Sequence, residues 1–181
     1  MRPQLFRTRI TELFGIRHPI LCMLGKMVQA PLAADAVKLP LAIGGGMATG
    51  RHLVTALAMG ADAILLGSRM LTASEIWAHP RYKERILAAM KIFRRHHRVL
   101  DNEAARSVED GVADFEAYRP LVTGRVTREA YETGDLSQGM LDLAPGGVFA
   151  REIKPVEAIF DELIDEAGSA IDRLERLGVP L

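Results

Sequence analysis

The sequence predicts an α/β fold: a partial TIM-barrel-like (β/α) unit with parallel strands and additional C-terminal helices. Over residues 1–72, short apolar runs alternate with stretches of helical periodicity, a pattern typical of parallel strands joined by crossover helices. From residue 73 to residue 181 the pattern becomes mainly helical. With 181 residues, 49% of them hydrophobic, the chain is expected to form a single domain, 1–181, around one core.

The first 72 residues predict three strands and the helices that connect them. In chain order we expect a short helix or turn over 8–16, a strand over 18–23, a helix over 26–37, a strand over 39–43, a helix over 49–59 and a strand over 61–66. Thr49 is a suitable N-cap for the helix that follows it, because its hydroxyl can accept a hydrogen bond from the first turn. Gly60 is a suitable residue to end that helix.

The remainder of the chain predicts helices separated by one long loop. One-sided apolar spacing indicates helices over 80–93 and 102–118. Residues 119–150 are rich in glycine and threonine and are expected to be mostly loop, with a short helix near 127–131. Pro155 begins the longest predicted helix. Its apolar stripe consists of Val156, Ile159, Phe160, Leu163, Ile164, Ala167, Ile171, Leu174 and Leu177.

Composition limits the classes of function. Lys plus Arg and Asp plus Glu number 23 each, so no overall field attracts nucleic acid or an anionic membrane. The one cysteine, Cys22, cannot form an internal disulfide, and the sequence has no Cys/His spacing typical of a metal site. No apolar run approaches the roughly 20 residues of a membrane span. We expect a cytoplasmic protein that acts on a small molecule and holds no metal.

Two of the predicted strands end in glycine, which indicates a phosphate site. Gly44, Gly45 and Gly46 follow one strand, and Gly67 and Ser68 follow the next. Loops after consecutive parallel strands open at the same end of a sheet, and glycine lets backbone N–H groups approach an anion closely. In eight-stranded barrels the loops after the last two strands commonly bind phosphate. A structural alternative stays open, in which these glycines only shape the turns.

Two further side chains are candidates for the same site. Arg69 directly follows Ser68, and its planar guanidinium suits two-point contact with a phosphate; a surface salt bridge is the alternative. Met23 ends the first predicted strand and can border a bound ring, with plain packing as the alternative.

At these residues the chain resembles the nitronate monooxygenase family, formerly called 2-nitropropane dioxygenases. Residues 40–53 and 56–70 are similar to the last two barrel strands of that family, residues 11–20 to its first strand, and residues 134–140 to its closing segment. The resemblance implies FMN as the cofactor, bound at the glycine loops. It also implies the oxidation of small alkyl nitronates with molecular oxygen.

The sequence departs from the family pattern in three places. The strand that resembles the first is followed almost at once by the one that resembles the seventh, so the middle strands are absent from this sequence. The family's Gly-Gly-His-Gly segment, which carries its usual catalytic base, is absent with them, and the catalytic residue is therefore unknown. Pro145 stands where the family often has an amide side chain that can contact the flavin.

These departures keep other functions open. One alternative is a catalytically incomplete relative that binds FMN or another phosphate ligand, or that only assembles with partners. Another keeps the phosphate site but performs reductase or nucleotide-processing chemistry. Three or four strands cannot close a barrel, and their open edges favour pairing with further sheet. We therefore expect self-association into a homo-oligomer.

Overall fold

The computed structural model describes residues 8–16, 22–24, 30–36, 38–89, 102, 106, 116, 119–120, 123–139, 141, 143 and 145–178. Its elements are α1 (Arg9–Leu13), β1 (Cys22–Leu24), α2 (Ala30–Ala36), β2 (Leu41–Ile43), α3 (Gly50–Ala58), β3 (Ala63–Ile64), η2 (Met70–Thr72), α4 (Pro80–Ala89), α7 (Gly124–Thr133), η3 (Pro145–Phe149) and α8 (Val156–Leu177). The η elements are 3₁₀-helices.

The three strands form one parallel sheet in the order β1-β2-β3, which confirms the predicted α/β unit. Met23 of β1 lies opposite Ala42 of β2, and Ala42 in turn lies opposite Ala63 of β3. In a closed barrel of eight parallel strands the first strand pairs with the last. Here β1 pairs with β2 but not with β3, the last described strand, so β1 and β3 are the two edges of the described sheet.

Small residues hold the connecting helices against this sheet. Leu41 and Ile43 of β2 are fully buried, and they share one core cluster with Ala30 of α2 and Ala56 of α3. The absence of long side chains at the helix positions lets both helices approach the strands closely. The sheet therefore packs against α2 and α3. This packing fixes where the loops after β2 and β3 begin.

Helix α3 begins as the sequence predicts. The Thr49 side chain accepts a hydrogen bond from the N–H of His52, which confirms Thr49 as the N-cap. Gly60 follows the end of α3 with φ of 88°, a left-handed conformation that suits glycine. A Cβ at Gly60 would lie 2.8 Å from the Cβ of Ala34, so the backbone that leaves α3 passes close to α2.

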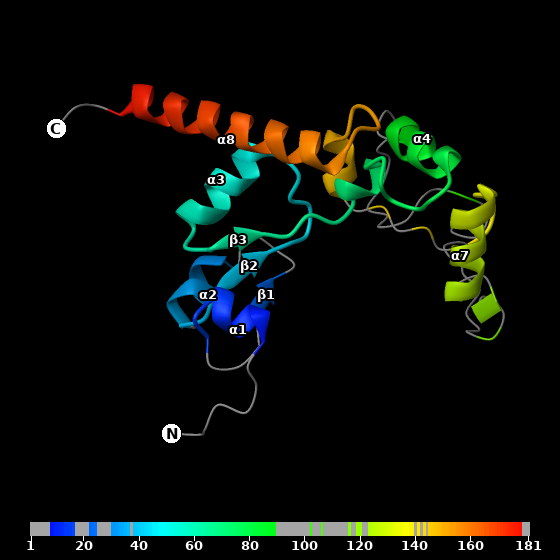
Figure 1. Ribbon diagram of the computed structural model, residues 1–181, viewed down its shortest axis with the longest axis horizontal. Helices are drawn as coiled ribbons and strands as arrows, with labels where there is room; N and C mark the ends of the chain where they lie inside the picture. Colours follow the sequence, from blue (N-terminus) through cyan, green and yellow to red (C-terminus); the bar gives the residue numbers. More distant parts are fainter. Residues whose placement is uncertain are drawn as a thin grey trace, which may run out of the picture.

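The long helix α8 lies along α3 (Figure 1). The two backbones touch at Gly50, where an added Cβ would overlap the amide nitrogen of Ala167 and the carbonyl oxygen of Leu163. At its start, the N–H of Val156 donates to the carboxylate of Glu75 at 2.9 Å. Because α3 follows β2 directly, this packing connects the C-terminal helix to the loop that leaves the sheet.

The predicted apolar stripe of α8 is buried only in part. Ile159, Leu163 and Ala167 are buried, but Phe160 is 50% and Ile164 62% exposed. The other exposed members of the stripe are Ile171, Leu174 and Leu177. Only part of the stripe is covered because α3 is shorter than α8. None of the described helices is both long enough and apolar enough to cross a membrane.

Helices α4 and α7 form a second cluster beyond the N-terminal end of α8 (Figure 1). Tyr82 and Ile86 of α4 are fully buried there with Ala130 of α7 and Leu141. The segment predicted as mostly loop contains α7, which is longer than expected and ends at Gly134 in the left-handed conformation. The helix predicted over 102–118 lies almost wholly outside the described residues, and the division of the chain near residue 72 stays a prediction.

Candidate functional site

The first glycine loop is a tight turn that requires glycine at two positions. Gly45 and Gly46 follow β2 with φ of 80° and 101°, values that other residues rarely adopt. Gly44 is buried, whereas Gly45 is exposed. Within the described part of the chain, the N–H groups of Gly45 and Gly46 donate to no other residue. Turn geometry thus explains these two glycines, and it also leaves their N–H groups available.

Gly67 differs, because the fold does not require glycine there. Its φ lies outside the positive range, and a Cβ added to it would meet no atom within 4 Å. The residue is exposed, and its carbonyl accepts a hydrogen bond from the N–H of Met70 at 2.8 Å, which begins η2. Backbone geometry therefore gives no reason for glycine at this position. Close approach of another molecule is a reason that remains.

The two loops lie together under η3. Gly146 of η3 is so close to the first loop that a Cβ there would lie 3.0 Å from the carbonyl oxygen of Met47. A Cβ on the next residue, Gly147, would lie 3.6 Å from the Cβ of Ser68 in the second loop. Pro145 is also a neighbour, since its Cβ lies 3.7 Å from the Cβ position of Gly46. The structure thus brings the two predicted loops to one place, with η3 across them.

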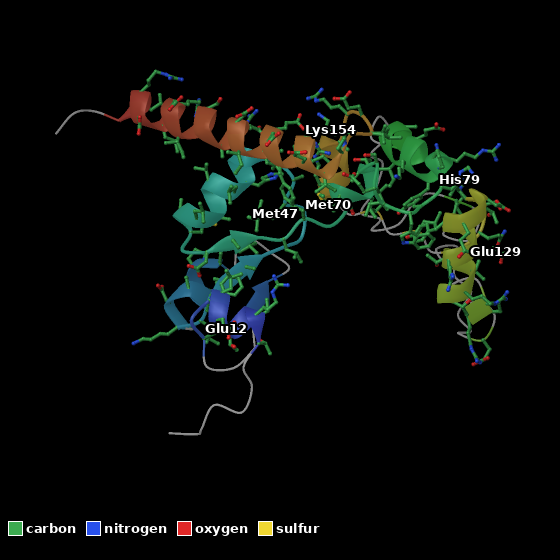
Figure 2. The ribbon with its side chains drawn as sticks, in the orientation of Figure 1. Glu12, Met47, Met70, His79, Glu129 and Lys154 are labelled. Carbon is green, nitrogen blue, oxygen red and sulfur yellow. The ribbon has the colours of Figure 1, made fainter. Side chains whose placement is uncertain are left out.

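The side chain of Arg69 does not lie with the two glycine loops but bonds to α8. This side chain is only 3% exposed, and its Nη2 donates to Glu162 Oε2 at 2.8 Å. Its Nη1 is buried and has no hydrogen-bond partner among the residues that the structure describes. The alternative for Arg69 was a surface salt bridge; the observed ion pair is instead buried on the arginine side. Met70, the next residue, packs under α8 against the buried cluster of Ala73, Ile159 and Leu163 (Figure 2).

Arg69 lines a cavity of about 480 Å³ between α3, η3 and α8. Five charged side chains line its wall: Arg51, Arg69, Arg151, Glu162 and Glu166. Neither Gly44–Gly46 nor Gly67 and Ser68 belong to that wall. The predicted site residues therefore divide into two places, with the glycine loops in one and Arg69 in the other.

Glu166 occupies the N-terminus of α3. One carboxylate oxygen accepts from the N–H of Gly50 at 3.0 Å, and the other accepts from Arg51 Nε at 2.9 Å. A helix N-terminus attracts negative charge because its first N–H groups lack partners within the helix. In this protein the Glu166 carboxylate accepts a hydrogen bond from the first N–H group of α3 and supplies the negative charge that this end attracts.

His52 shapes the wall of the same cavity. Its Nδ1 accepts a hydrogen bond from the N–H of Ala48 at 3.1 Å, and its ring lies edge-on to Phe149, with 5.1 Å between ring centroids. Burial lowers the pKa of His52 below its ordinary value of 6.5, although nearby Glu166 acts in the opposite direction. The imidazole is therefore neutral at pH 7 and serves as an acceptor.

Met23 lies on β1, next to the strand that carries the first glycine loop. Its side chain lies outside the described part of the structure, so its role as a border of a bound ring stays a prediction. In the described residues no group of three or more His, Cys, Asp or Glu side chains is arranged to hold a metal ion.

Sequence reasoning missed most of the cavity. Arg51, His52, Arg151, Glu162 and Glu166 were not predicted as a group. The spacing of the two glutamates on one face of α8 was visible, because residues four apart on a helix are neighbours. Their partners were not visible, since Arg69 precedes Glu162 by 93 residues and Arg51 precedes Glu166 by 115.

A parallel β/α unit whose two glycine loops lie together defines a partial (β/α) barrel. The sequence model described as nitronate monooxygenase matches residues 17–166. The chain belongs to the nitronate monooxygenase family. This confirms the resemblance noted for its glycine strands.

This chain matches parts of longer proteins. A Bacillus subtilis (strain 168) protein named probable nitronate monooxygenase is 42% identical over 65 residues, which are 36% of this chain and 19% of that protein. The structure of FabK from Thermotoga maritima superimposes with a TM-score of 0.75 at 24% identity, covering 87% of this chain and 57% of FabK. For nitroalkane oxidase from Streptomyces ansochromogenes the TM-score is 0.66 at 24% identity, with 82% of this chain and 45% of the oxidase covered. The chain thus spans 57% of FabK and 45% of the oxidase, and these likenesses establish its fold.

Proposed function

We propose that this protein binds FMN and that the two glycine loops hold the phosphate of the flavin. The observation that carries the proposal is that the loops after β2 and β3 lie together at the carboxyl-terminal end of these parallel strands. Gly45, Gly46 and Gly67 would donate backbone N–H groups, and Ser68 would add its hydroxyl. The exposed Gly67, whose glycine the fold itself does not require, supports the assignment.

The flavin ring would extend from this phosphate toward β1, with Met23 at its border. FMN supplies electron transfer between an organic substrate and molecular oxygen. This chain contributes the backbone donors of the two loops, while η3 covers them and reduces their contact with water. Pro145 lies beside Gly46 and has no N–H or side-chain amide, so it contributes no hydrogen bond to the ring.

Membership of the nitronate monooxygenase family supports small alkyl nitronates as the substrate class. The protein would oxidise them with oxygen, in keeping with the family to which the chain belongs. No residue is assigned as the catalytic base, because no histidine stands in a Gly-Gly-His-Gly segment. That observation favours one second candidate: an FMN-binding relative that performs no turnover by itself.

Two measurements test these candidates in sequence. Purified protein that is yellow and releases FMN on denaturation supports flavin binding; colourless protein whose melting temperature does not respond to excess FMN contradicts it. Oxygen uptake on addition of an alkyl nitronate then separates the two candidates. Uptake that depends on bound FMN supports the monooxygenase, and a yellow protein without uptake supports the non-catalytic binder.

A further inference from the structure

His52 of α3 connects the end of the first glycine loop to the helix that follows it. Its Nδ1 accepts a hydrogen bond from the N–H of Ala48 at 3.1 Å, and its own N–H donates to the Thr49 hydroxyl at 3.2 Å. Ala48 is the second residue after Gly46, and only 3% of its surface is exposed. This exchange resembles a capping box, in which the third residue of a helix bonds back to a backbone N–H at the helix start. The imidazole therefore fixes the backbone where the loop enters α3.

The same ring also contacts η3, which lies across the glycine loops. The ring of His52 meets the ring of Phe149 edge-on, with 5.1 Å between their centroids. Phe149 ends η3, and η3 packs closely against the loop at Gly146, where a Cβ would lie 3.0 Å from the carbonyl oxygen of Met47. Since Met47 directly precedes Ala48, one side chain contacts both the loop and the 3₁₀-helix that covers it.

The hydrogen bond from Ala48 requires an uncharged ring. An imidazole accepts through Nδ1 only when its proton is on Nε2, whereas an imidazolium carries a proton on both nitrogens and has no acceptor. Protonation of His52 would therefore leave the N–H of Ala48 facing a second N–H group. A buried donor without an acceptor is costly, so the backbone at Ala48 would have to move.

Charged side chains near the ring come from several elements. Glu166 of α8 favours the protonated ring and Arg51 of α3 disfavours it, but burial has the largest effect and lowers the pKa of His52 below 6.5. The other charged side chains that line the same cavity are Arg69, Arg151 and Glu162. The ring is thus neutral at pH 7 and becomes protonated in acidic solution.

We propose that His52 is a positioning residue for the flavin site, and that the neutral ring holds the first glycine loop in the conformation that binds the phosphate of FMN. Protonation of the ring releases Ala48 and weakens binding of the cofactor. This inference rests on the proposed function, since it assigns a pH response to the same glycine loops. His52 acts through Ala48 and not by contact with FMN.

The test is a fluorescence titration of FMN into the flavin-free protein at pH 8 and at pH 5, with circular dichroism to confirm folding at each pH. The phosphate of FMN itself takes up a proton at about pH 6, so the unaltered protein is compared with His52→Asn. Asparagine keeps an acceptor close to the position of Nδ1 but does not titrate. We expect similar affinities for the two proteins at pH 8, and about tenfold weaker binding by the unaltered protein at pH 5.

Two further variants complete the experiment. His52→Leu removes the acceptor and should bind FMN about tenfold more weakly than His52→Asn at both pH values. His79→Asn is the matched control, because His79 Nδ1 accepts from the N–H of Arg81 at 3.2 Å in the same way, at the start of α4. Figure 2 shows His79 far from Met47, the residue that follows the glycine loop. His79→Asn should therefore show the pH dependence of the unaltered protein.

Parallel pH profiles for the unaltered protein and His52→Asn would overturn the inference while leaving FMN binding in place. If none of the proteins binds FMN at either pH, the proposed function itself fails, and this inference fails with it. A second readout uses flavin-free, ¹⁵N-labelled protein, in which the amide signals of Gly46 and Ala48 should shift as the His52 ring titrates. Constant signals at both amides while the ring titrates would also overturn the inference.

Discussion

Arg69 and Glu162 connect the loop after β3 to α8, with 2.8 Å between Nη2 of the arginine and Oε2 of the glutamate. The arginine side chain is 3% exposed and the glutamate side chain 48% exposed. The pair therefore places a buried cation under the edge of a helix, and its carboxylate partner reaches solvent. This arrangement fixes α8 relative to the loops proposed to bind phosphate.

Removal of this carboxylate should destabilise the fold. In Glu162→Ala the guanidinium of Arg69 stays buried and loses its acceptor, at a cost of about 1–3 kcal/mol. Urea unfolding followed by circular dichroism measures the change. The control is Glu132→Ala, which breaks the exposed Arg128–Glu132 pair and should change stability by less than about 0.5 kcal/mol. Equal effects of the two variants would contradict the role given to Arg69.

The contact between α3 and α8 predicts opposite effects for two glycines. In Gly50→Ala the new Cβ would overlap the backbone of Ala167 and Leu163, so the two helices must separate. We expect a loss of about 3 kcal/mol or failure to fold. Gly168→Ala has open space around its Cβ position and should stabilise α8 by about 0.5–1 kcal/mol. A neutral Gly50→Ala variant would show that the helices do not pack in this way.

Local patterns predicted the strands, the cap at Thr49 and the start of α8, because these depend on neighbours in sequence. The pairing of β1 with β2 also follows from their closeness in the chain. The cavity could not be predicted, since it depends on contacts such as that between Arg51 and Glu166 across the fold. How far the apolar stripe of α8 is buried could not be predicted for a related reason, because the stripe alone does not show which element packs against it.

Stability should decrease in mildly acidic solution because of His52. Burial lowers its folded pKa below 6.5, so the unfolded chain binds a proton first as the pH falls. The contribution of the neutral ring is fully present above about pH 6.5 and is lost as the pH falls through the lower folded pKa. Melting temperatures from pH 7.5 to pH 5 should therefore fall less steeply for His52→Gln than for the unaltered protein. Parallel curves would rule out this contribution.

Self-association is expected at the open edge of the sheet. Phe160 and Ile164 are exposed, and with Ile64 of the edge strand β3 they line an apolar depression of about 420 Å³. Exposed apolar surface beside an unpaired strand favours association. Sedimentation velocity should show an oligomer for the unaltered chain and a shift toward monomer for Ile164→Glu. A monodisperse monomer of the unaltered chain would count against this expectation.

We propose that the glycine loops after β2 and β3 hold the phosphate of FMN. This proposal is tested most directly by titrating FMN into the flavin-free protein and its Gly67→Asp variant, with quenching of flavin fluorescence as the signal. The introduced carboxylate would place an anion where the phosphate is expected, yet the new side chain has room, so stability should change little. Gly124→Asp at the start of α7, also in open space, is the control. We expect at least about a hundredfold weaker binding for Gly67→Asp alone, equivalent to about 2.7 kcal/mol. Equal FMN affinity in all three proteins would contradict it.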